Sequence, residues 1–506
     1  MRSVLGWLCA PALVCSASAA HAEWRKFETA HFIIYSESND KRVDELATGL
    51  ESTDGLMRMA TGLPMDAEAV KIRIYEMGDE GQVQAALGQT NSGVAGFYTD
   101  NILGPYAVTL RKAYSADGDF TAQIVLHHEY AHHFMMQYFP ATYPSWYVEG
   151  FAELIGASKT LPDGRIAYGW PAKYRGDAIA AFWVDVRDVL LTPIEKLHDF
   201  DLYGQGWAMT HYLTFSKERS GQLRRYLAAL NAGKSREEAA SAFGDLEELN
   251  REAHAYLSKG SFNYTPVSVP LNKPVIERVT PVGAAEAALI PDTIAFNDDD
   301  LSLYRKSGDR ERELDRRQKV LADIRKEAAR FSSDPYAQYL LALAEDSSGN
   351  DAAAGTAVDR LLAISPQHVG GMVLKSMLLS KQAMKASGQA RIAEAEQARR
   401  LAMAANKQDP DNPLAYVAFY EGFHAAGAAV PANAVQGLEA ALAKLPNNTR
   451  IRQMLVDELA SERRWGDAMK VLAPLANSPH ESPLRQAARE QMAQLQAALS
   501  QQKPAG

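Results

Sequence analysis

The sequence predicts an α+β domain, with a mixed sheet and several helices, followed by an all-α domain of stacked helices. Apolar, β-rich runs alternate with stretches of helical periodicity through residues 23–262. From about Asn297 the chain becomes Ala-rich and almost entirely helical. A chain of 506 residues is also too long for one hydrophobic core, so two or three domains are expected.

The composition is that of a globular protein, with 47% hydrophobic and 23% charged residues. The formal net charge of -9 leaves no basic footprint, so a nucleic-acid partner is not expected. No stretch of 18 or more apolar residues follows the N-terminal segment, and no membrane-spanning helix is expected there.

Residues 1–22 have the pattern of a cleaved signal peptide. Arg2 precedes the short apolar run Val4–Val14, and small residues follow it. A membrane anchor is the alternative, but the run is too short to span a bilayer. Both cysteines, Cys9 and Cys15, lie in this segment, so the mature chain would lack thiols. We therefore expect a periplasmic or secreted protein without disulfides or a stable membrane anchor, in which histidines and carboxylates bind any metal.

The region before residue 111 predicts the sheet and its first helices. One predicted strand, Tyr106–Arg111, directly precedes the histidine-rich helix described next and is a candidate edge for pairing with extended substrate backbone. An ordinary position inside the sheet is the alternative. The other predicted strands are Phe27–Ser36, Val70–Tyr75 and Gly93–Tyr98, and the predicted helices are Asp40–Thr61 and Asp79–Leu87.

A histidine-rich helix carries the pattern H-E-x-x-H at His128, Glu129 and His132. Residues four apart lie on one face of a helix, so both histidines can bind one metal ion. Glu129 would project beside them toward a metal-bound water. A solvated helix with scattered histidines is the alternative.

A second helical stretch supplies carboxylates at the right distance. Glu149 follows His132 by 17 positions and is a candidate third ligand. Two histidines and one glutamate leave a coordination position open for water, as catalytic zinc sites do, with Glu129 as general base. Glu153, one turn further, can hydrogen-bond the far nitrogen of a ligand histidine. The alternative is a pair of solvated carboxylates, which their apolar neighbours disfavour.

H-E-x-x-H followed by W-x-x-E-G-x-A-E resembles the gluzincin superfamily of zinc metallopeptidases, especially the bacterial peptidase-MA-like proteins, over roughly residues 115–215. The resemblance implies a thermolysin-like domain and one Zn²⁺ per chain, bound by His128, His132 and Glu149, with Glu129 catalytic. The aminopeptidase motif G-x-M-E-N is missing, so an endopeptidase is expected. The extra histidines 127 and 133 are expected to support the site or lie on the surface.

Gluzincins also supply a Tyr or His from a later helix to stabilise the oxyanion of the tetrahedral intermediate. In this chain the corresponding stretch contains Tyr203, the first candidate, and His211, the second. Each can equally be a packing residue between helices.

The chain after residue 262 predicts a connection and then helical repeats. Residues 263–296, rich in Pro and Val, are expected to form a linker or a small strand-bearing connector. Residues 297–500 are expected to form a tetratricopeptide-like solenoid, with an unrelated helical bundle as the alternative. The evidence is the spacing of five prolines, with gaps of 31, 44, 36 and 33 residues: Pro335, Pro366, Pro410, Pro446 and Pro479. The gap of 44 would accommodate an extended helix over Gln382–Lys407.

Two functions from different classes fit these patterns. The first is an exported zinc metallopeptidase whose repeats bind protein or peptide partners. The second is a non-catalytic repeat scaffold or adaptor whose peptidase-like domain binds peptides or envelope proteins without cutting them. Glu129 favours the first, because binding alone needs no general base. Hydrolysis of a bond other than a peptide bond stays open.

Overall fold

The computed structural model describes most of the chain after the predicted signal peptide, residues 1–22, which lies outside the described residues. Within the described part, no helix combines the length and apolar character needed to cross a membrane. The described residues are 23–66, 70–87, 96–111, 121–139, 143–176, 182–193, 196–197, 202–299, 301, 304, 306–478 and 482–502.

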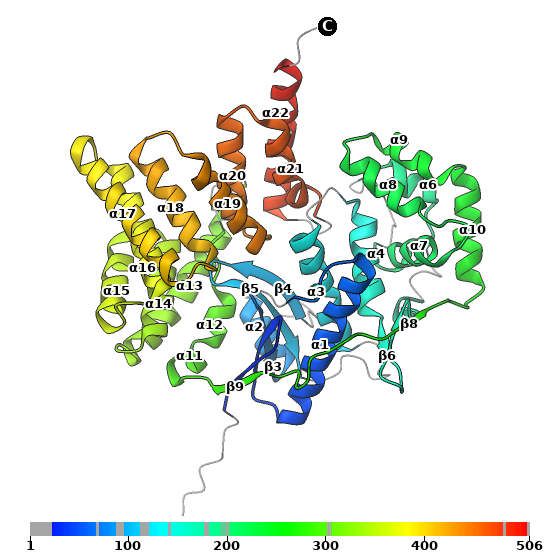
Figure 1. Ribbon diagram of the computed structural model, residues 1–506, viewed down its shortest axis with the longest axis horizontal. Coiled ribbons are helices and arrows are strands. Elements are labelled where there is room, and N and C mark those ends of the chain that lie inside the picture. The colour runs from blue at the N-terminus through cyan, green and yellow to red at the C-terminus, as the bar shows by residue number, and fades with distance from the viewer. Residues whose placement is uncertain are drawn as a thin grey trace, which may run out of the picture.

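A six-stranded mixed sheet forms the centre of the N-terminal half, with strand order β4-β5-β3-β2-β1-β9 (Figure 1). The pairs β2–β3 and β3–β5 are parallel, and the other pairs are antiparallel. The sheet is therefore mixed, as the sequence predicts. Its strands are β1 (Arg25–Glu28), β2 (Phe32–Ser36), β3 (Ile72–Met77), β4 (Gly96–Asn101), β5 (Gly104–Leu110) and β9 (Arg278–Pro281).

The strand predicted as a candidate substrate edge, Tyr106–Arg111, instead has the alternative position inside the sheet. β5, which corresponds to the predicted strand Tyr106–Arg111, pairs on both sides and lies inside the sheet. Of the described strands, β4 lies at this edge instead. The chain reverses at Ile102 and Leu103 and lays β4 outside β5, so β4 is the outermost described strand on this side of the sheet.

Helices cover both faces of the sheet because its strands alternate apolar side chains between two cores. One core joins Phe32, Ile34 and Ile74 to α1 and α3. The other joins Tyr75 and Tyr106 to α2 and α12. These helices are α1 (Asp40–Thr61), α2 (Glu80–Leu87), α3 (Ala122–Tyr138) and α12 (Ile290–Ala295).

A buried polar network fixes α1 against the back of α3. Asp54 of α1 accepts hydrogen bonds from the Tyr130 hydroxyl of α3 at 2.5 Å and from Arg58 at 2.6 Å. His31 Nδ1 lies 2.6 Å from Glu51 and its Nε2 lies 2.8 Å from the carbonyl oxygen of Asp66. Burial disfavours the imidazolium, but the hydrogen bond to Glu51 and the charges of Asp54 and Glu51 outweigh it and raise the pKa of His31.

A helical lobe and a small sheet follow α4 (Ser145–Gly156). The lobe packs around its own core, to which α4 contributes Trp146. Its helices are α6 (Val186–Leu191), α7 (Gly204–Phe215), α8 (Gln222–Asn231), α9 (Arg236–Ala240) and α10 (Leu246–Ser258). The small sheet, in the order β6-β7-β8, contains β6 (Lys159–Thr160), β7 (Ile166–Tyr168) and β8 (Thr265–Val267).

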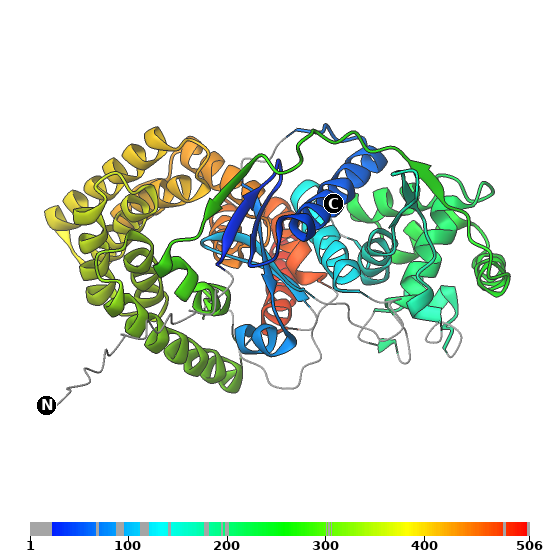
Figure 2. The same ribbon diagram turned by 90° about the horizontal axis from the view of Figure 1, so that it is seen from below.

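The predicted linker, residues 263–296, has the strand-bearing form that the sequence left open. It contributes β8 to the small sheet, crosses the molecule (Figure 2) and adds β9 to the central sheet beside β1. It then forms α11 (Ala284–Ala288) and α12. Extended backbone with few helix formers can pair with open strand edges, so this stretch belongs to the N-terminal fold.

The C-terminal half is a helical repeat, in which successive antiparallel helices stack on one continuous core. The first helices of the pairs begin at Pro335, Val369, Pro413, Thr449 and Pro483, 34, 44, 36 and 34 residues apart. The helices are α13 (Ser307–Arg330), α14 (Pro335–Ser347), α15 (Asp351–Ile364), α16 (Val369–Lys385), α17 (Gly388–Gln408), α18 (Pro413–Ala426), α19 (Ala432–Lys444), α20 (Thr449–Ser461), α21 (Trp465–Ala476) and α22 (Pro483–Gln502).

The extended helix expected over Gln382–Lys407 is wrong. α16 ends at Lys385, because the following residue, Ala386, has extended backbone with φ of -88° and ψ of 170°, and α17 begins at Gly388. The longer repeat arises because both helices of this pair are long.

The network behind α3 should respond to pH in a defined way. His31→Leu should lower the free energy of unfolding by about 3–5 kcal/mol at pH 6, because Glu51 is left buried without its charged partner. The raised pKa of His31 means that its contribution is complete below its ordinary pKa and is lost as pH rises through the folded value. The difference between wild type and variant, measured by urea unfolding, should therefore shrink toward pH 9.

The double variant His31→Leu/Glu51→Leu is the control. Because the two side chains interact, it should be destabilised by less than the sum of the single changes. Additive penalties, or a His31→Leu penalty independent of pH, would contradict this account.

Candidate metal centre

Close packing of three helices places the candidate site. A side chain at Gly150 of α4 would put its Cβ 2.2 Å from the carbonyl oxygen of Gly206 in α7, a distance that real atoms do not reach. A Cβ at Gly156 would lie 3.1 Å from the carbonyl oxygen of Ile124 and 3.3 Å from the Cβ of His128 in α3. α4 therefore lies in contact with both helices. The residue that follows Glu149 in the motif is glycine because a larger side chain at position 150 would collide with α7.

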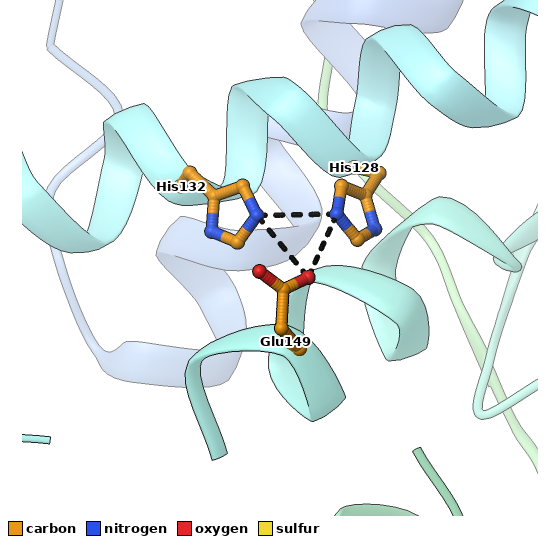
Figure 3. Close-up of side chains that lie close together, drawn as sticks. All are labelled: His128, His132 and Glu149. Carbon is orange, nitrogen blue, oxygen red and sulfur yellow. Dashed lines mark hydrogen bonds and ion pairs between the residues drawn. The ribbon is translucent and has the colours of Figure 1, made fainter. Parts of the chain in front are cut away.

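This packing brings Glu149 beneath His128 and His132, as Figure 3 shows. The two Nε2 atoms lie 3.1 Å apart, and the Oε2 of Glu149 lies 3.2 Å from His128 and 3.6 Å from His132. Ligand atoms bound tetrahedrally to one zinc ion lie roughly 3.3–3.4 Å apart. The predicted ligand set therefore converges at the spacing that zinc requires, and the three residues fit the ion.

The electrostatics of the cluster also favour a cation. Glu149 and Glu153 are 0% and 1% exposed, and burial alone would favour their neutral forms. The neighbouring histidines outweigh burial and lower the pKa of Glu149, and His128 and Arg175 lower that of Glu153 to about 2. Conversely, burial of His128 is outweighed by hydrogen bonds to the two carboxylates, which raise its pKa to about 10. Two buried carboxylates thus demand positive charge at this point.

Glu153 holds His128 from the side opposite Glu149, as predicted. Its Oε1 lies 3.2 Å from His128 Nδ1. Tyr174 donates to Oε2 at 2.9 Å, and Arg175 donates to Oε1 at 2.6 Å. Glu153 therefore orients the ring so that Nε2 faces the candidate metal position. The sequence analysis missed Tyr174 and Arg175, because nothing in their spacing links them to α4.

Glu129 lies beside the cluster and faces a cleft. Glu129 and His132 line one end of a cavity of about 200 Å³ that also touches Tyr98 of β4. Glu129 is half-buried, unlike the two carboxylates of α4. It therefore stands between the candidate metal ligands and the space where a substrate would lie.

The two candidates for oxyanion stabilisation differ in position. The ring of Tyr203 lies 6.0 Å from that of His128, and the Arg175 guanidinium lies 4.8 Å above the Tyr203 ring. Burial and the charges of Glu149 and Glu129 raise the pKa of Tyr203 to about 12, so its hydroxyl keeps its proton. Tyr203 can therefore act as a hydrogen-bond donor next to the cluster.

His211 is packed elsewhere. It is fully buried, with Nε2 2.8 Å from the carbonyl oxygen of Gly169 and Nδ1 2.9 Å from the Tyr256 hydroxyl. Burial lowers its pKa to about 4, so the ring is neutral. This geometry favours the packing role that the sequence analysis left open for His211.

The two flanking histidines point away from the cluster. His127 Nδ1 lies 3.1 Å from the Thr53 hydroxyl of α1, and His133 Nδ1 bonds the hydroxyl of Tyr98. Both are buried, so the expectation of surface positions is wrong, and each fastens α3 to a neighbouring element instead. Burial lowers the pKa of His127 to about 4 and that of His133 to about 3.

A second group of metal-ligating residues exists among the described residues, namely His31, Glu51 and Asp54. Each already has strong partners in the network between α1 and α3. We therefore assign this group a structural role.

Comparison with known proteins gives no family assignment. No family model matches the chain, and no curated protein matches it in sequence. Among solved structures, a thermophilic TPR protein of Thermus thermophilus is 22% identical and covers 39% of this chain and 100% of its own, with a TM-score of 0.32. A double mutant of MamA RS-1 is 16% identical over 38% of this chain and 96% of its own, with a TM-score of 0.23. At such TM-scores, the helical repeat is established by the packing of α13–α22 themselves.

The ligand set makes a prediction about metal content. Purified full-length protein should contain one zinc ion per chain, measured by elemental analysis. Glu149→Gln should lose stoichiometric zinc, because one anionic ligand is removed. Glu153→Gln should still bind zinc, but about 10–100-fold more weakly, because Glu153 only orients His128.

His133→Asn is the matched control, since His133 is a buried histidine of the same helix that points elsewhere. It should retain one zinc per chain, with an unchanged circular dichroism spectrum. Zinc-free wild type after refolding with excess zinc, or zinc retained in Glu149→Gln, would contradict the assignment.

Proposed function

We propose that this protein is an exported zinc metallopeptidase of the gluzincin type that cuts within peptide chains. The observation that carries the proposal is the convergence of His128, His132 and Glu149 at zinc-ligand spacing, with Glu129 beside them facing a cleft. Three protein ligands leave a coordination position open, which is typical of catalytic zinc sites and not of structural ones.

Zinc held there would act as a Lewis acid and lower the pKa of a bound water to about 7. Glu129 accepts a proton from the attacking water and returns it to the leaving amine as the peptide bond breaks. Tyr203, which keeps its proton, donates a hydrogen bond to the oxyanion of the tetrahedral intermediate. Glu153 keeps His128 in the tautomer that presents Nε2 to the ion.

The strand β4 lies beside the candidate catalytic residues. Tyr98 of β4 lines the same cavity as Glu129 and His132. A peptide bound in this cavity would therefore lie between the outermost described strand of the sheet and the candidate metal ligands.

The competing function is a repeat scaffold that binds peptides at this cleft without cutting them. It shares the cleft and the repeats with the proposed function but has no use for a general base. Both functions include repeats of the tetratricopeptide type that bind protein or peptide partners.

Glu129→Gln separates the two functions. The variant should keep one zinc per chain, while cleavage of an unfolded protein such as casein should fall by about 10²–10⁴-fold, because the amide cannot accept a proton. Cleavage products are measured by mass spectrometry. Activity equal to wild type would refute the mechanism, and a zinc-loaded wild type that cuts no casein or peptide library would favour the scaffold.

Tyr203→Phe tests the oxyanion role. Loss of one hydrogen-bond donor should lower kcat by about 10²–10³-fold with little change in KM, because the hydrogen bond forms only in the transition state. Kinetics on a fluorogenic peptide measure both parameters, and His211→Asn is not expected to show this split. A change confined to KM would exclude Tyr203 from the role.

A further inference from the structure

The candidate active cleft has a wall made by the C-terminal repeats. Figure 1 shows α20 and α21 lying against the end of α3 and β4. The cavity lined by Glu129 and His132 is also lined by six residues of the repeats, which form this wall: Asn447, Arg452, Pro474, Leu475, Asn477 and Ser478. The site that the N-terminal half contributes is thus completed by residues far away in the sequence.

The wall is fixed to the N-terminal half by direct contacts. The side chain of Gln137 at the end of α3 donates to the carbonyl oxygen of Ala443 at 2.7 Å. Thr449 at the start of α20 donates to Asp299 at 2.8 Å, and the neighbouring Asp298 accepts from the backbone of Ile102 in the β4–β5 turn at 3.0 Å. Ile102 itself is buried in the core of the repeats. These contacts hold the repeats against the cleft.

The wall is also ordered within itself. Arg452 is 4% exposed, and its two terminal nitrogens donate to the carbonyl oxygens of Pro446 and Val471. It therefore joins the turn before α20 to α21. Both terminal nitrogens of Arg452 are thus used within the wall, so Arg452 acts as a positioning residue.

The chemistry and size of the cavity indicate its occupant. The lining includes polar residues, but most of it is apolar or aromatic: Tyr98, Met135, Met136, Phe139, Tyr143 and Val148 from the N-terminal half, and Pro474 and Leu475 from the repeats. Its volume of about 200 Å³ is below the roughly 300–1,000 Å³ of pockets for whole small ligands. Paired methionines adapt to varied apolar shapes.

We propose that this cavity binds one large apolar or aromatic side chain of the substrate, next to the bond that is cut, and that the repeats set this specificity through Leu475. The inference rests on the proposed peptidase function, because Glu129 and His132, which line the cavity, define the position of that bond. Away from Glu129, His132 and Arg452, the apolar lining does not replace the hydration that a charged side chain loses on entering, so an apolar side chain is favoured.

The test measures binding without cleavage. Full-length, zinc-loaded Glu129→Gln protein is titrated with a blocked heptapeptide of Ala and Gly carrying one central Phe, and with the same peptide carrying Ala or Asp there. The Phe peptide should bind about 10–100-fold more tightly than the Ala peptide, as burial of one large apolar side chain allows. Adding Leu475→Arg, which fills the cavity, should reduce that ratio to about one.

Met403→Arg is the matched control, because it adds the same side chain to α17 at a methionine that is 51% exposed and does not line the cavity. It should leave the ratio unchanged. Leu475→Ala, which adds no bulk, serves if the arginine variant misfolds, and it should lower the ratio several-fold.

Equal binding of the Phe and Ala peptides, tighter binding of the Asp peptide, or a ratio unaffected by both Leu475 variants overturns the inference. Each outcome is independent of catalysis. The peptidase function fails separately, if zinc-loaded wild type cuts none of these peptides and no casein.

Discussion

The contact of α4 with α3 and α7 is the constraint on which the candidate site depends. Gly150 and Gly206 let the backbones of α4 and α7 touch, and Gly156 lets α4 approach α3. Any side chain at Gly150 would push α4 away from α7. A displacement of about 1 Å at a catalytic group can cost about 10²-fold in rate. The glycine after Glu149 therefore belongs to the chemistry of the site, although it offers no functional group.

The helix that carries the histidines could be interpreted from sequence because its information is local. A rotation of about 100° per residue separates His128 and His132 from His127 and His133, and the structure places the two pairs accordingly. The positions of Glu149 and Glu153 followed for the same reason, since one helical turn relates them. Burial of the flanking pair was not predictable, because it depends on Thr53 and on β4.

Features that depend on distant pairing were out of reach. The sequence suggested two strands around residue 103 but not which of them lies outside, because strand order is decided by the partner that β3 selects. Tyr174 and Arg175 support Glu153 from a short 3₁₀ turn with no periodic pattern. The recurring prolines did predict the helix pairs, because a proline at the start of a helix or just after its end acts locally. Pro335 begins α14, and Pro366, Pro410 and Pro446 lie two residues after the ends of α15, α17 and α19. The contact between the repeats and the cleft could not be predicted, because no local sequence pattern indicates it.

Residues 263–296, which join the two halves of the chain, form part of the fold and are more than a linker. β9 pairs with β1, so residues 278–281 complete the sheet that begins at residue 25. The helix α12 then covers the sheet face opposite α3, and it also packs with the first repeat helix. A protein cut at residue 262 would expose the edge of β1 and one face of the sheet. The repeats and the N-terminal half are therefore structurally interdependent.

This interdependence bears on the form in which a substrate can be bound. The proposed occupant of the cavity is a single side chain next to the bond that is cut. An extended chain suits this arrangement, because its successive side chains point to alternate sides and one of them can enter the cavity while the backbone passes Glu129 and His132. The wall formed by α20 and α21 would then act on one side chain, and the residues of α3 on the backbone beside it.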